Sequence, residues 1–315
     1  MPLDLAAIRA AHARIRDKIH RTPVLTSQWL DEQGGGKLFF KCENFQKVGA
    51  FKARGATNAI FALSTAEAAR GVVTHSSGNH AAAVARAAQL RGIPSHIVMP
   101  RDAAKPKLAA VRGYGGTIVF CEPTLAAREA TCARVMAETG AVLVHPYNDE
   151  AVMAGQGTAV LEFLEEIPDL ELVLAPVGGG GLLAGTAVAA KGMKPGIRVI
   201  GVEPAQADDA AQSFRAGRIV AVPSNTIADG LRATLGERNF PLIRAHVDDI
   251  VTVSEQSIVS AMQRLWEVLK IVVEPSGAVP YAAILDGKLA LSGCRAGIIL
   301  TGGNVDLASL PWIKG

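Results

Sequence analysis

Short runs of β-branched and other apolar residues alternate with alanine-rich segments along almost the whole chain. Several of these runs have no polar face, which is typical of strands buried on both sides of a parallel sheet. Stretches of about 10 to 20 residues separate most of them, which suits crossover helices. We therefore predict an α/β fold with strands at residues 38–42, 72–75, 96–99, 117–121, 142–145, 172–177, 198–202, 250–253 and 297–301.

Nine strands are more than one sheet usually holds, so we predict two doubly wound, mostly parallel sheets. The four strand and helix units between residues 72 and 146 form a continuous block. This predicts a larger domain of residues 1–63 and 149–315 and a smaller domain of residues 64–148. Such sheets bind ligands at the carboxyl ends of their strands, which places the expected site in the cleft between the domains.

Composition narrows the class of partner. The 315 residues are 49% hydrophobic and 19% charged, enough to bury a core without disulfides or metals. Lysine and arginine number 32 and aspartate and glutamate 29, and this net charge of +3 favours neither nucleic acid nor a membrane surface. The four cysteines lack metal-binding spacing, and we recognise neither an export signal nor a membrane span. We expect a cytoplasmic protein with a small-molecule ligand.

Four consecutive glycines, Gly178, Gly179, Gly180 and Gly181, directly follow the predicted strand that ends at Val177. An apolar, alanine-rich segment comes next. A turn of this kind exposes backbone N–H groups at the start of a helix, where they bind phosphate without any side chain. The alternative is a flexible connector. The spacing differs from the G-x-G-x-x-G of dinucleotide sites, which weakens the case for NAD.

Three further segments lie near predicted strand ends. The segment Ser76-Ser77-Gly78-Asn79-His80 offers groups that suit a carboxylate, although the same residue types also cap helices. Lys52 stands beside Phe51, which can support a flat ring, and Schiff-base chemistry requires a desolvated lysine. Thr301 begins a Thr-Gly-Gly-Asn turn. A lysine, a phosphate turn, a carboxylate receptor and a hydroxyl for a ring nitrogen are together what pyridoxal phosphate (PLP) needs.

In this order, the segments GAFKARGA, SSGNH, VGGGG and TGGNVDL resemble the motifs of the fold-type II PLP enzymes, which share the tryptophan synthase β-like fold. The resemblance covers essentially the whole chain and is to the threonine and serine dehydratase group. Residues 201–209 and 226–230 are most similar to the branch of serine racemase and L-threo-3-hydroxyaspartate ammonia-lyase. The resemblance implies a homodimer with PLP in the interdomain cleft.

The resemblance also implies roles for single residues. Lys52 would form the Schiff base and take the α-proton, and Ser77 would face it from the other side of the substrate as the second catalytic residue of a racemase. The expected PLP-binding residues are Phe51, Lys52, Asn79, Gly178, Gly179, Gly180, Gly181 and Thr301, and the expected substrate-binding residues are Ser76, Ser77, His80 and Arg128. For Arg128 the alternative is a surface position on a helix. A divalent cation (magnesium, calcium or manganese) is expected at Glu203, the carbonyl of Ala207 and Asp209, for which the alternative is a solvated loop.

The chain also departs from the family pattern. Val48 and Ala50 stand where threonine and serine are usual, and Ala233 stands where serine racemase has a serine beside its substrate. This last departure puts serine in doubt as the physiological substrate. For a substrate with a second carboxylate, the candidate cations are Arg128, Arg232 and His145.

Three functions stay open at this point. The leading one is a PLP-dependent ammonia-lyase, or dehydratase, that converts L-threo-3-hydroxyaspartate, L-threonine or L-serine to a 2-oxo acid. The second is a serine racemase with dehydration as a side reaction. The third is a non-catalytic sensor of an amino acid or a phosphate-bearing ligand, against which Lys52 argues because binding alone needs no Schiff base.

Overall fold

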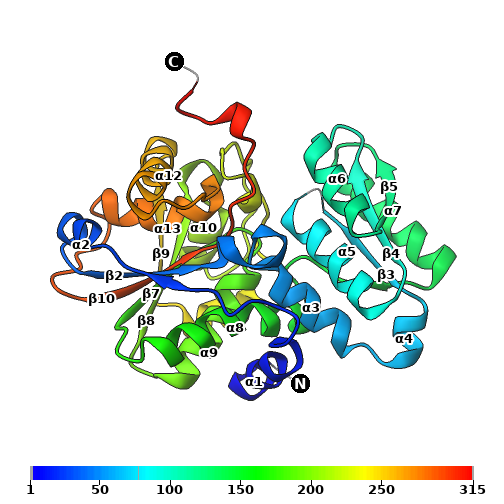
Figure 1. Ribbon diagram of the computed structural model, residues 1–315, viewed down its shortest axis with the longest axis horizontal. Helices are drawn as coiled ribbons and strands as arrows, with labels where there is room; N and C mark the ends of the chain where they lie inside the picture. The colour runs from blue at the N-terminus through cyan, green and yellow to red at the C-terminus, as the bar shows by residue number, and fades with distance from the viewer. Residues whose placement is uncertain (1–2, 77, 314–315) are drawn as a thin grey trace.

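The chain folds into two lobes, each built on its own sheet (Figure 1). The computed structural model describes residues 3–76 and 78–313. The larger lobe has six strands in the spatial order β1 (Val24–Leu25), β2 (Lys37–Cys42), β10 (Arg295–Leu300), β7 (Leu172–Pro176), β8 (Arg198–Pro204) and β9 (Asp249–Val253). The smaller lobe has four, in the order β5 (Thr117–Cys121), β4 (Ser95–Pro100), β3 (Val72–His75) and β6 (Val142–Leu143).

Every neighbouring pair of these strands is parallel except β1 with β2. The predicted α/β fold with two mostly parallel sheets is therefore confirmed. The strands of the smaller sheet all lie inside the range predicted for the smaller domain, while the exact domain boundaries stay a prediction. All nine predicted strands are present, and β1 was missed because two residues give no periodic pattern.

Helices cover both faces of the larger sheet, as Figure 1 shows for α8 and α9 on one side and α12 and α13 on the other. Alternate residues of β7 enter different cores, since Val173 packs in one and Leu174 in the other. The helices are α1 (Leu5–Ile15), α2 (Gln28–Gly34), α3 (Lys52–Ala62), α4 (Thr65–Ala69), α5 (Asn79–Arg91), α6 (Lys105–Gly113), α7 (Leu125–Thr139), α8 (Glu150–Glu166), α9 (Gly181–Met193), α10 (Asp209–Ala216), α11 (Phe240–His246), α12 (Glu255–Leu269) and α13 (Pro275–Leu285). Short 3₁₀ turns cover Glu43–Phe45, Lys47–Gly49, Ala205–Ala207, Asp229–Leu231 and Leu307–Ser309.

Three of the predicted strands end earlier than expected. β7 and β10 each stop one residue short, and β6 stops at Leu143, two residues before the predicted end. The reason at β6 is local, because the ring of His145 accepts hydrogen bonds from the backbone N–H groups of Tyr147 and Asn148 and so turns the chain out of the sheet. None of the helices in the described ranges is long and apolar enough to cross a membrane.

Candidate functional site

Lys52 opens helix α3 next to the carboxyl end of the larger sheet. The preceding segment is held there by backbone contacts, in which Phe51 N donates to Thr301 O at 2.9 Å and Ala50 pairs with Gly302. The amine of Lys52 donates to the carbonyl of Pro146 at 2.8 Å, a neutral partner. Burial lowers the pKa of Lys52 to about 8. The structure thus brings together Phe51, Lys52 and Thr301, as the sequence predicts.

The tetraglycine turn lies between β7 and α9, against the segment that holds Lys52. A methyl group on Gly179 would lie 2.4 Å from ring carbons of Tyr147, and one on Gly181 would lie 2.9 Å from the backbone of the same residue. Gly180 has a φ of 87°, in the left-handed region that favours glycine. Only glycines fit here, so the turn keeps its backbone N–H groups free of side-chain cover at the start of α9. The shape and donors of this cradle fit a phosphate.

The small-lobe segment lies at the start of α5. His80 is buried, and its Nε2 donates to the carbonyl of Val144 at 3.0 Å, because a carbonyl oxygen only accepts. Burial, reinforced by the nearby charge of Lys52, holds the pKa of His80 well below its usual range. The neutral ring therefore has only an acceptor, Nδ1, to offer. If His80 contacts a carboxylate, it does so through its backbone N–H. Ser77 lies outside the described residues, and Ser76 directly follows β3.

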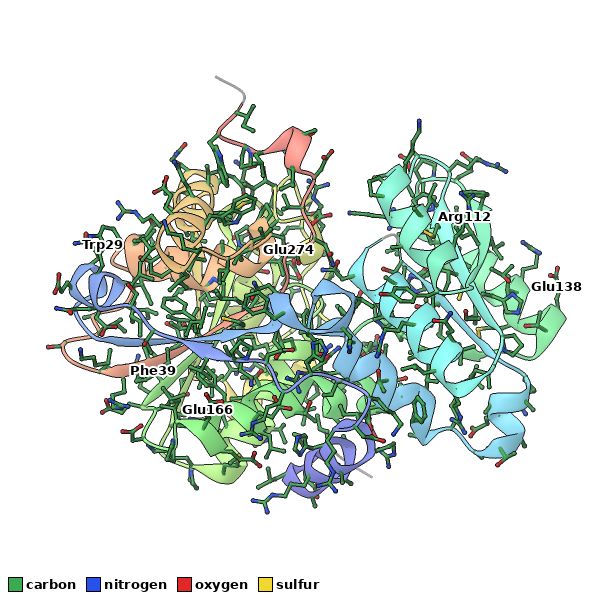
Figure 2. All side chains as sticks on the ribbon, viewed as in Figure 1. Trp29, Phe39, Arg112, Glu138, Glu166 and Glu274 are labelled. Atoms are coloured by element: carbon green, nitrogen blue, oxygen red, sulfur yellow. The ribbon has the colours of Figure 1, made fainter. Side chains whose placement is uncertain are left out.

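The amide of Asn79 is held in one orientation by two residues of the larger lobe. Its Nδ2 donates to Glu274 Oε1 at 2.9 Å, and its Oδ1 accepts from Asn304 Nδ2 at 2.9 Å. The second Nδ2 hydrogen stays available for a ligand oxygen. Glu274 also accepts from Asn304 N at 3.1 Å, and burial raises the pKa of Glu274 to about 8. Figure 2 shows Glu274 on the side of the larger lobe that faces the smaller one.

Sequence reasoning did not identify three residues of the site, Tyr147, Pro146 and Glu274. The first two come just after a predicted strand, where the ligand sites of α/β sheets commonly lie, and this position could have indicated them. Glu274 lies in an irregular stretch before α13 and has no comparable mark. Of the candidate cations, Arg232 is exposed, and its Nε donates to Thr226 O at 2.8 Å. Arg128 lies half-buried on α7.

The predicted cation-binding residues are buried, so the alternative of a solvated loop is wrong. Glu203 ends β8 in the interior, and its two oxygens accept from Ala210 N at 3.0 Å and Ala211 N at 2.8 Å. Burial raises the pKa of Glu203 to about 9 and that of Asp209 to about 7. Neither forms a salt bridge within residues 3–76 and 78–313. Two desolvated carboxylates without a counter-charge fit a hard divalent cation.

That pair does not form a cation site by itself. No group of three or more His, Cys, Asp or Glu side chains in the described part of the chain could hold a metal ion. A cation at Glu203 and Asp209 therefore needs carbonyl or water ligands as well, and the predicted carbonyl of Ala207 is of the required type. Ala207 is itself buried in the 3₁₀ turn between β8 and α10.

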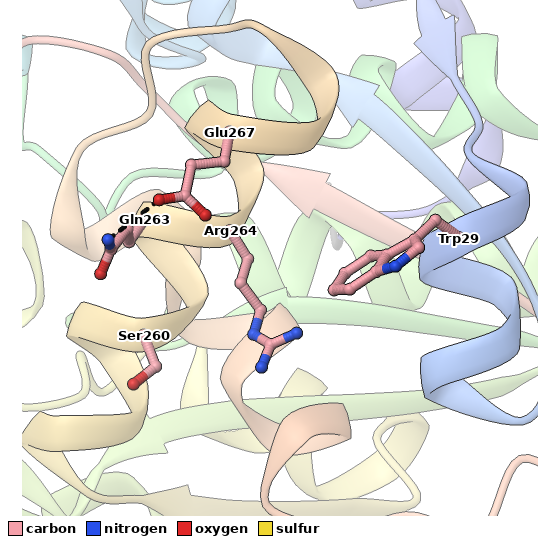
Figure 3. Close-up of a pocket in the computed structure, with 5 residues that line it drawn as sticks. All are labelled: Trp29, Ser260, Gln263, Arg264 and Glu267. Carbon is pink, nitrogen blue, oxygen red and sulfur yellow. Dashed lines mark hydrogen bonds between the residues drawn. The ribbon is translucent and has the colours of Figure 1, made fainter.

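A separate hollow of about 360 Å³ lies between α2 and α12 (Figure 3). Arg264 stacks over the ring of Trp29 at 5.2 Å, and Ser260, Gln263 and Glu267 complete the lining. This set includes none of the residues predicted for PLP, substrate or cation. The hollow is therefore distinct from the candidate site, which lies where α3, α5, α9 and the ends of both sheets meet.

The fold and the enclosed lysine beside a glycine cradle define a PLP-dependent enzyme of fold type II. Residues 15–302 match the family described as pyridoxal-phosphate dependent enzyme, and the chain belongs to this family. It is 54% identical over 304 residues to the beta-hydroxyaspartate dehydratase of Paracoccus denitrificans, covering 96% of each chain. It is 52% identical over 313 residues to the serine racemase of Arabidopsis thaliana, covering 98% of this chain and 95% of that protein.

Among solved structures, maize serine racemase superimposes with a TM-score of 0.96 at 51% identity, covering 99% of this chain and 97% of that one. The resemblance to fold-type II enzymes, and to the branch that contains serine racemases and hydroxyaspartate dehydratases, is confirmed. Because members with either activity are similarly close, family membership does not select between racemisation and dehydration.

Proposed function

We propose that the chain is an ammonia-lyase that acts on a β-hydroxy amino acid: water is eliminated first, and hydrolysis of the resulting imine by another water then releases ammonia and gives a 2-oxo acid. The observation that carries this proposal is the surroundings of Lys52, whose enclosed amine has a carbonyl as its partner and lies beside the glycine cradle. PLP, when bound, withdraws electrons from the α-carbon of an amino acid. A neutral amine at that carbon can then take the α-proton.

Each remaining residue of the site has a proposed part in binding. Gly178, Gly179, Gly180 and Gly181 hold the phosphate, Phe51 packs on the ring, and Asn79 donates its free amide hydrogen to the ring hydroxyl. Ser76 and the backbone N–H groups at the start of α5 bind the substrate carboxylate. Thr301 faces the ring nitrogen. A hydroxyl is far too weak an acid to protonate that nitrogen, so the negative charge at the α-carbon is relieved by loss of the β-hydroxyl, which favours elimination over transamination.

We also propose that a divalent cation binds at Glu203, the carbonyl of Ala207 and Asp209. The support is the burial of two carboxylates without a counter-charge described above. The cation would link β8 to the start of α10, so its expected effect is on stability. Removing it with EDTA should lower the melting temperature of the holoenzyme, and added Mg²⁺, Ca²⁺ or Mn²⁺ should restore it. An unchanged melting temperature would count against the site.

Serine racemisation is the second candidate, favoured by the 52% identity to the racemase from Arabidopsis thaliana. It would need a proton donor on the face of the substrate opposite Lys52, a role we propose for Ser77. The variant Ser77→Ala should then lose racemisation while keeping much of the elimination of the L-substrate. Equal loss of both reactions would remove Ser77 from this role.

One experiment tests the main proposal. Serine, threonine and L-threo-3-hydroxyaspartate are incubated with the holoenzyme, and oxo acid and amino-acid chirality are measured in the same samples. The proposal expects oxo acid as the main product from at least one substrate. Accumulation of D-serine with little oxo acid would favour the racemase instead, and absence of both products would contradict the proposed reaction type.

A further inference from the structure

Asn239 lies against the tetraglycine turn, just before α11, and its side chain is fully buried. Its Nδ2 donates to the carbonyl of Gly179 at 2.7 Å and to the carbonyl of Tyr147 at 3.3 Å. Carbonyl oxygens only accept, so both hydrogens of the amide are used and the amide has one orientation. A single buried side chain therefore joins the glycine turn to the residue that covers it.

Helix capping does not account for this asparagine. An asparagine at the start of a helix usually accepts a hydrogen bond from a backbone N–H of the first turn, but the side chain of Asn239 makes no such bond. Its Oδ1 is buried without a hydrogen-bond partner among residues 3–76 and 78–313. An unpaired amide oxygen in the interior costs free energy, which offsets part of what the two donated bonds contribute to stability. The role of the amide therefore lies in what its two donors hold in place.

The bond to Gly179 fixes the peptide unit between Gly179 and Gly180. This peptide is trans, so its carbonyl and the N–H of Gly180 point in opposite directions. The bond from Asn239 to the carbonyl therefore turns the N–H of Gly180 away from Asn239. Within the described ranges this N–H donates to no other group, and it lies at the start of α9, the positive end of the helix dipole. It is thus directed for a phosphate oxygen.

The glycine turn needs such a restraint. Glycine has no Cβ, so four glycines in a row can adopt several peptide orientations. A methyl group on Gly180 would lie 2.6 Å from Asn239 Oδ1 and 2.7 Å from Leu235 Cδ2, so these two side chains close one side of the turn. Asn239 is itself held, because the neighbouring Arg238 N donates to Asn148 Oδ1 at 2.9 Å. A hydrogen bond at the carbonyl also polarises the peptide, which strengthens the N–H at its other end as a donor.

We propose that Asn239 is a positioning residue for PLP, which orients the peptide between Gly179 and Gly180 so that Gly180 N–H donates to the phosphate. The bond to Tyr147 is the longer of the two, so the main effect is on the phosphate rather than on the ring. This inference rests on the PLP site of the proposed function and is independent of the reaction that follows.

Two variants of similar shape test the donor. In Asn239→Thr a hydroxyl can donate to the carbonyl of Gly179, whereas in Asn239→Val a methyl group replaces that hydroxyl. The probes are PLP and pyridoxal, which share the ring and the aldehyde and differ in the phosphate. Each probe is titrated into the full-length apoprotein, and its dissociation constant is measured from the visible absorbance of the ring joined to Lys52. The control is Asn58→Val, because Asn58 is also buried and its Nδ2 donates to a carbonyl of α8, Ala151 O, at 2.7 Å.

Asn239→Val should weaken PLP binding roughly tenfold and leave pyridoxal binding nearly unchanged, because a hydrogen bond to a charged group is misdirected. Asn239→Thr should recover part of the PLP affinity, and Asn58→Val should keep the native ratio of the two dissociation constants. Unchanged PLP affinity in Asn239→Val, equal weakening of both probes, or a threonine variant no better than the valine variant would overturn the role of Asn239. If Asn239→Val does not fold, Asn239→Thr against the native protein decides, with a smaller loss expected for PLP alone.

The native protein distinguishes this failure from failure of the proposed function. If it binds PLP and forms oxo acid while the ratio of the two constants stays the same in Asn239→Val, the ammonia-lyase stands and the role of Asn239 is wrong. If it binds PLP and forms no oxo acid from any of the β-hydroxy amino acids, the proposed reaction fails, and the ratio still decides the role of Asn239. If neither PLP nor pyridoxal produces the visible absorbance with the native apoprotein, both proposals are wrong.

Discussion

Lys52 and Arg54 are cations in the first turn of the same helix, Lys52 partly buried and Arg54 fully buried, and their surroundings are opposite. Arg54 donates from Nε to Glu43 Oε2 at 2.7 Å and from Nη2 to Glu162 Oε2 at 2.8 Å. Burial alone would lower the pKa of Arg54, but the two carboxylates outweigh it and raise the pKa. Lys52 has the carbonyl of Pro146 instead, and its pKa falls. One cation is neutralised by its protein environment, and the other is left for a ligand.

The buried salt bridges among Lys41, Glu43, Arg54 and Glu162 form a cluster, called the paired cluster below, that has a structural role. Lys41 from β2 joins it by donating to Glu162 Oε2 at 3.0 Å and to Thr22 O at 2.8 Å, so β2, α3 and α8 meet in one fully satisfied network. Burial opposes ionisation of Glu162, but hydrogen bonds from His12 and Arg54 hold its pKa well below the usual range. The cluster fixes α3, and with it the position of Lys52. Buried charge that is paired stabilises the framework, whereas buried charge without a counter-charge marks the groups available for chemistry.

We expect the largest change in the free energy of unfolding when the paired cluster is broken. Replacing Arg54 with methionine leaves Glu43 and Glu162 buried with too little positive charge. We expect the free energy of unfolding to fall by about 3 to 5 kcal/mol, because removing one partner leaves an uncompensated charge in the interior. Urea denaturation of the apoprotein measures this change.

The matched control is Arg21→Met. Arg21 pairs with Glu165 at 2.9 Å, one turn along α8 from Glu162, but both of these side chains are largely exposed. Its loss should change the free energy of unfolding by less than about 1 kcal/mol. If Arg54→Met does not fold, Arg54→Lys keeps the charge and should give a folded protein of intermediate stability. Equal effects at positions 21 and 54 would remove the distinction between exposed and buried pairs.

We expect a smaller change in the free energy of unfolding from Glu274. Burial shifts the pKa of this carboxyl toward its neutral form, as it does for the amine of Lys52. The pKa of Glu274 is raised from 4.5 to about 8, so the folded protein binds its proton more tightly than the unfolded chain does. The stability from this group is complete below pH 4.5 and is lost as the pH rises through 8. Between pH 5 and 9, the native apoprotein should therefore lose about 2 to 3 kcal/mol relative to Glu274→Gln, which cannot titrate.

Denaturation curves of both proteins at several pH values test this expectation. The control is Glu165→Gln, whose exposed carboxyl should give the same pH dependence as the native protein. A constant difference between native protein and Glu274→Gln across the whole range would show that the carboxyl is ionised throughout. Its hydrogen bonds from Asn79 and Asn304 would then outweigh its burial.

The fold and several residues of the site could be predicted from the sequence because the patterns that indicate them are local. Apolar runs, glycines and strand ends lie within a few residues of one another, which is how Lys52, the glycine turn and Thr301 were placed at one edge of the sheet. The charge pairing could not be predicted. Arg54 lies only two residues from Lys52 in the same motif, and its partner Glu162 is 108 residues away, so no local pattern separates the two cations.

The same limit explains what was missed in the site. Asn79 and Glu274 are 195 residues apart, and Lys52 and Pro146 are 94 apart. The burial of Glu203 and Asp209 was likewise invisible in a segment that is locally polar. Sequence periodicity reports which face of an element is apolar, but a hydrogen bond between distant segments depends on how the elements pack. The residues that orient Asn79 and enclose the lysine therefore emerged only from the structure.

We expect the smallest change in the free energy of unfolding from removing the unpaired charge at Lys52. Its sign should be opposite to that of Arg54→Met, because the Lys52 variant should be more stable than the native protein. The pKa of Lys52 is lowered from 10.5 to about 8, so below pH 8 the folded apoprotein carries a desolvated ammonium group. We expect Lys52→Met to stabilise the apoprotein at pH 7 by about 1 to 2 kcal/mol, a value reduced for partial solvent access. The gain should shrink between pH 8 and 10.5, where the native lysine becomes neutral in both states.

Urea denaturation of the apoproteins at pH 7 and pH 10.5 measures this gain, with the exposed Lys105→Met as the control that changes little. The same Lys52→Met protein should also lack the visible absorbance of PLP joined to a lysine, which ties the gain in stability to the loss of the reactive amine. A less stable variant at pH 7 would mean that the amine of Lys52 is held by more than one carbonyl. Lys52 and Arg54 would then both belong to the framework, and the contrast between them would fail.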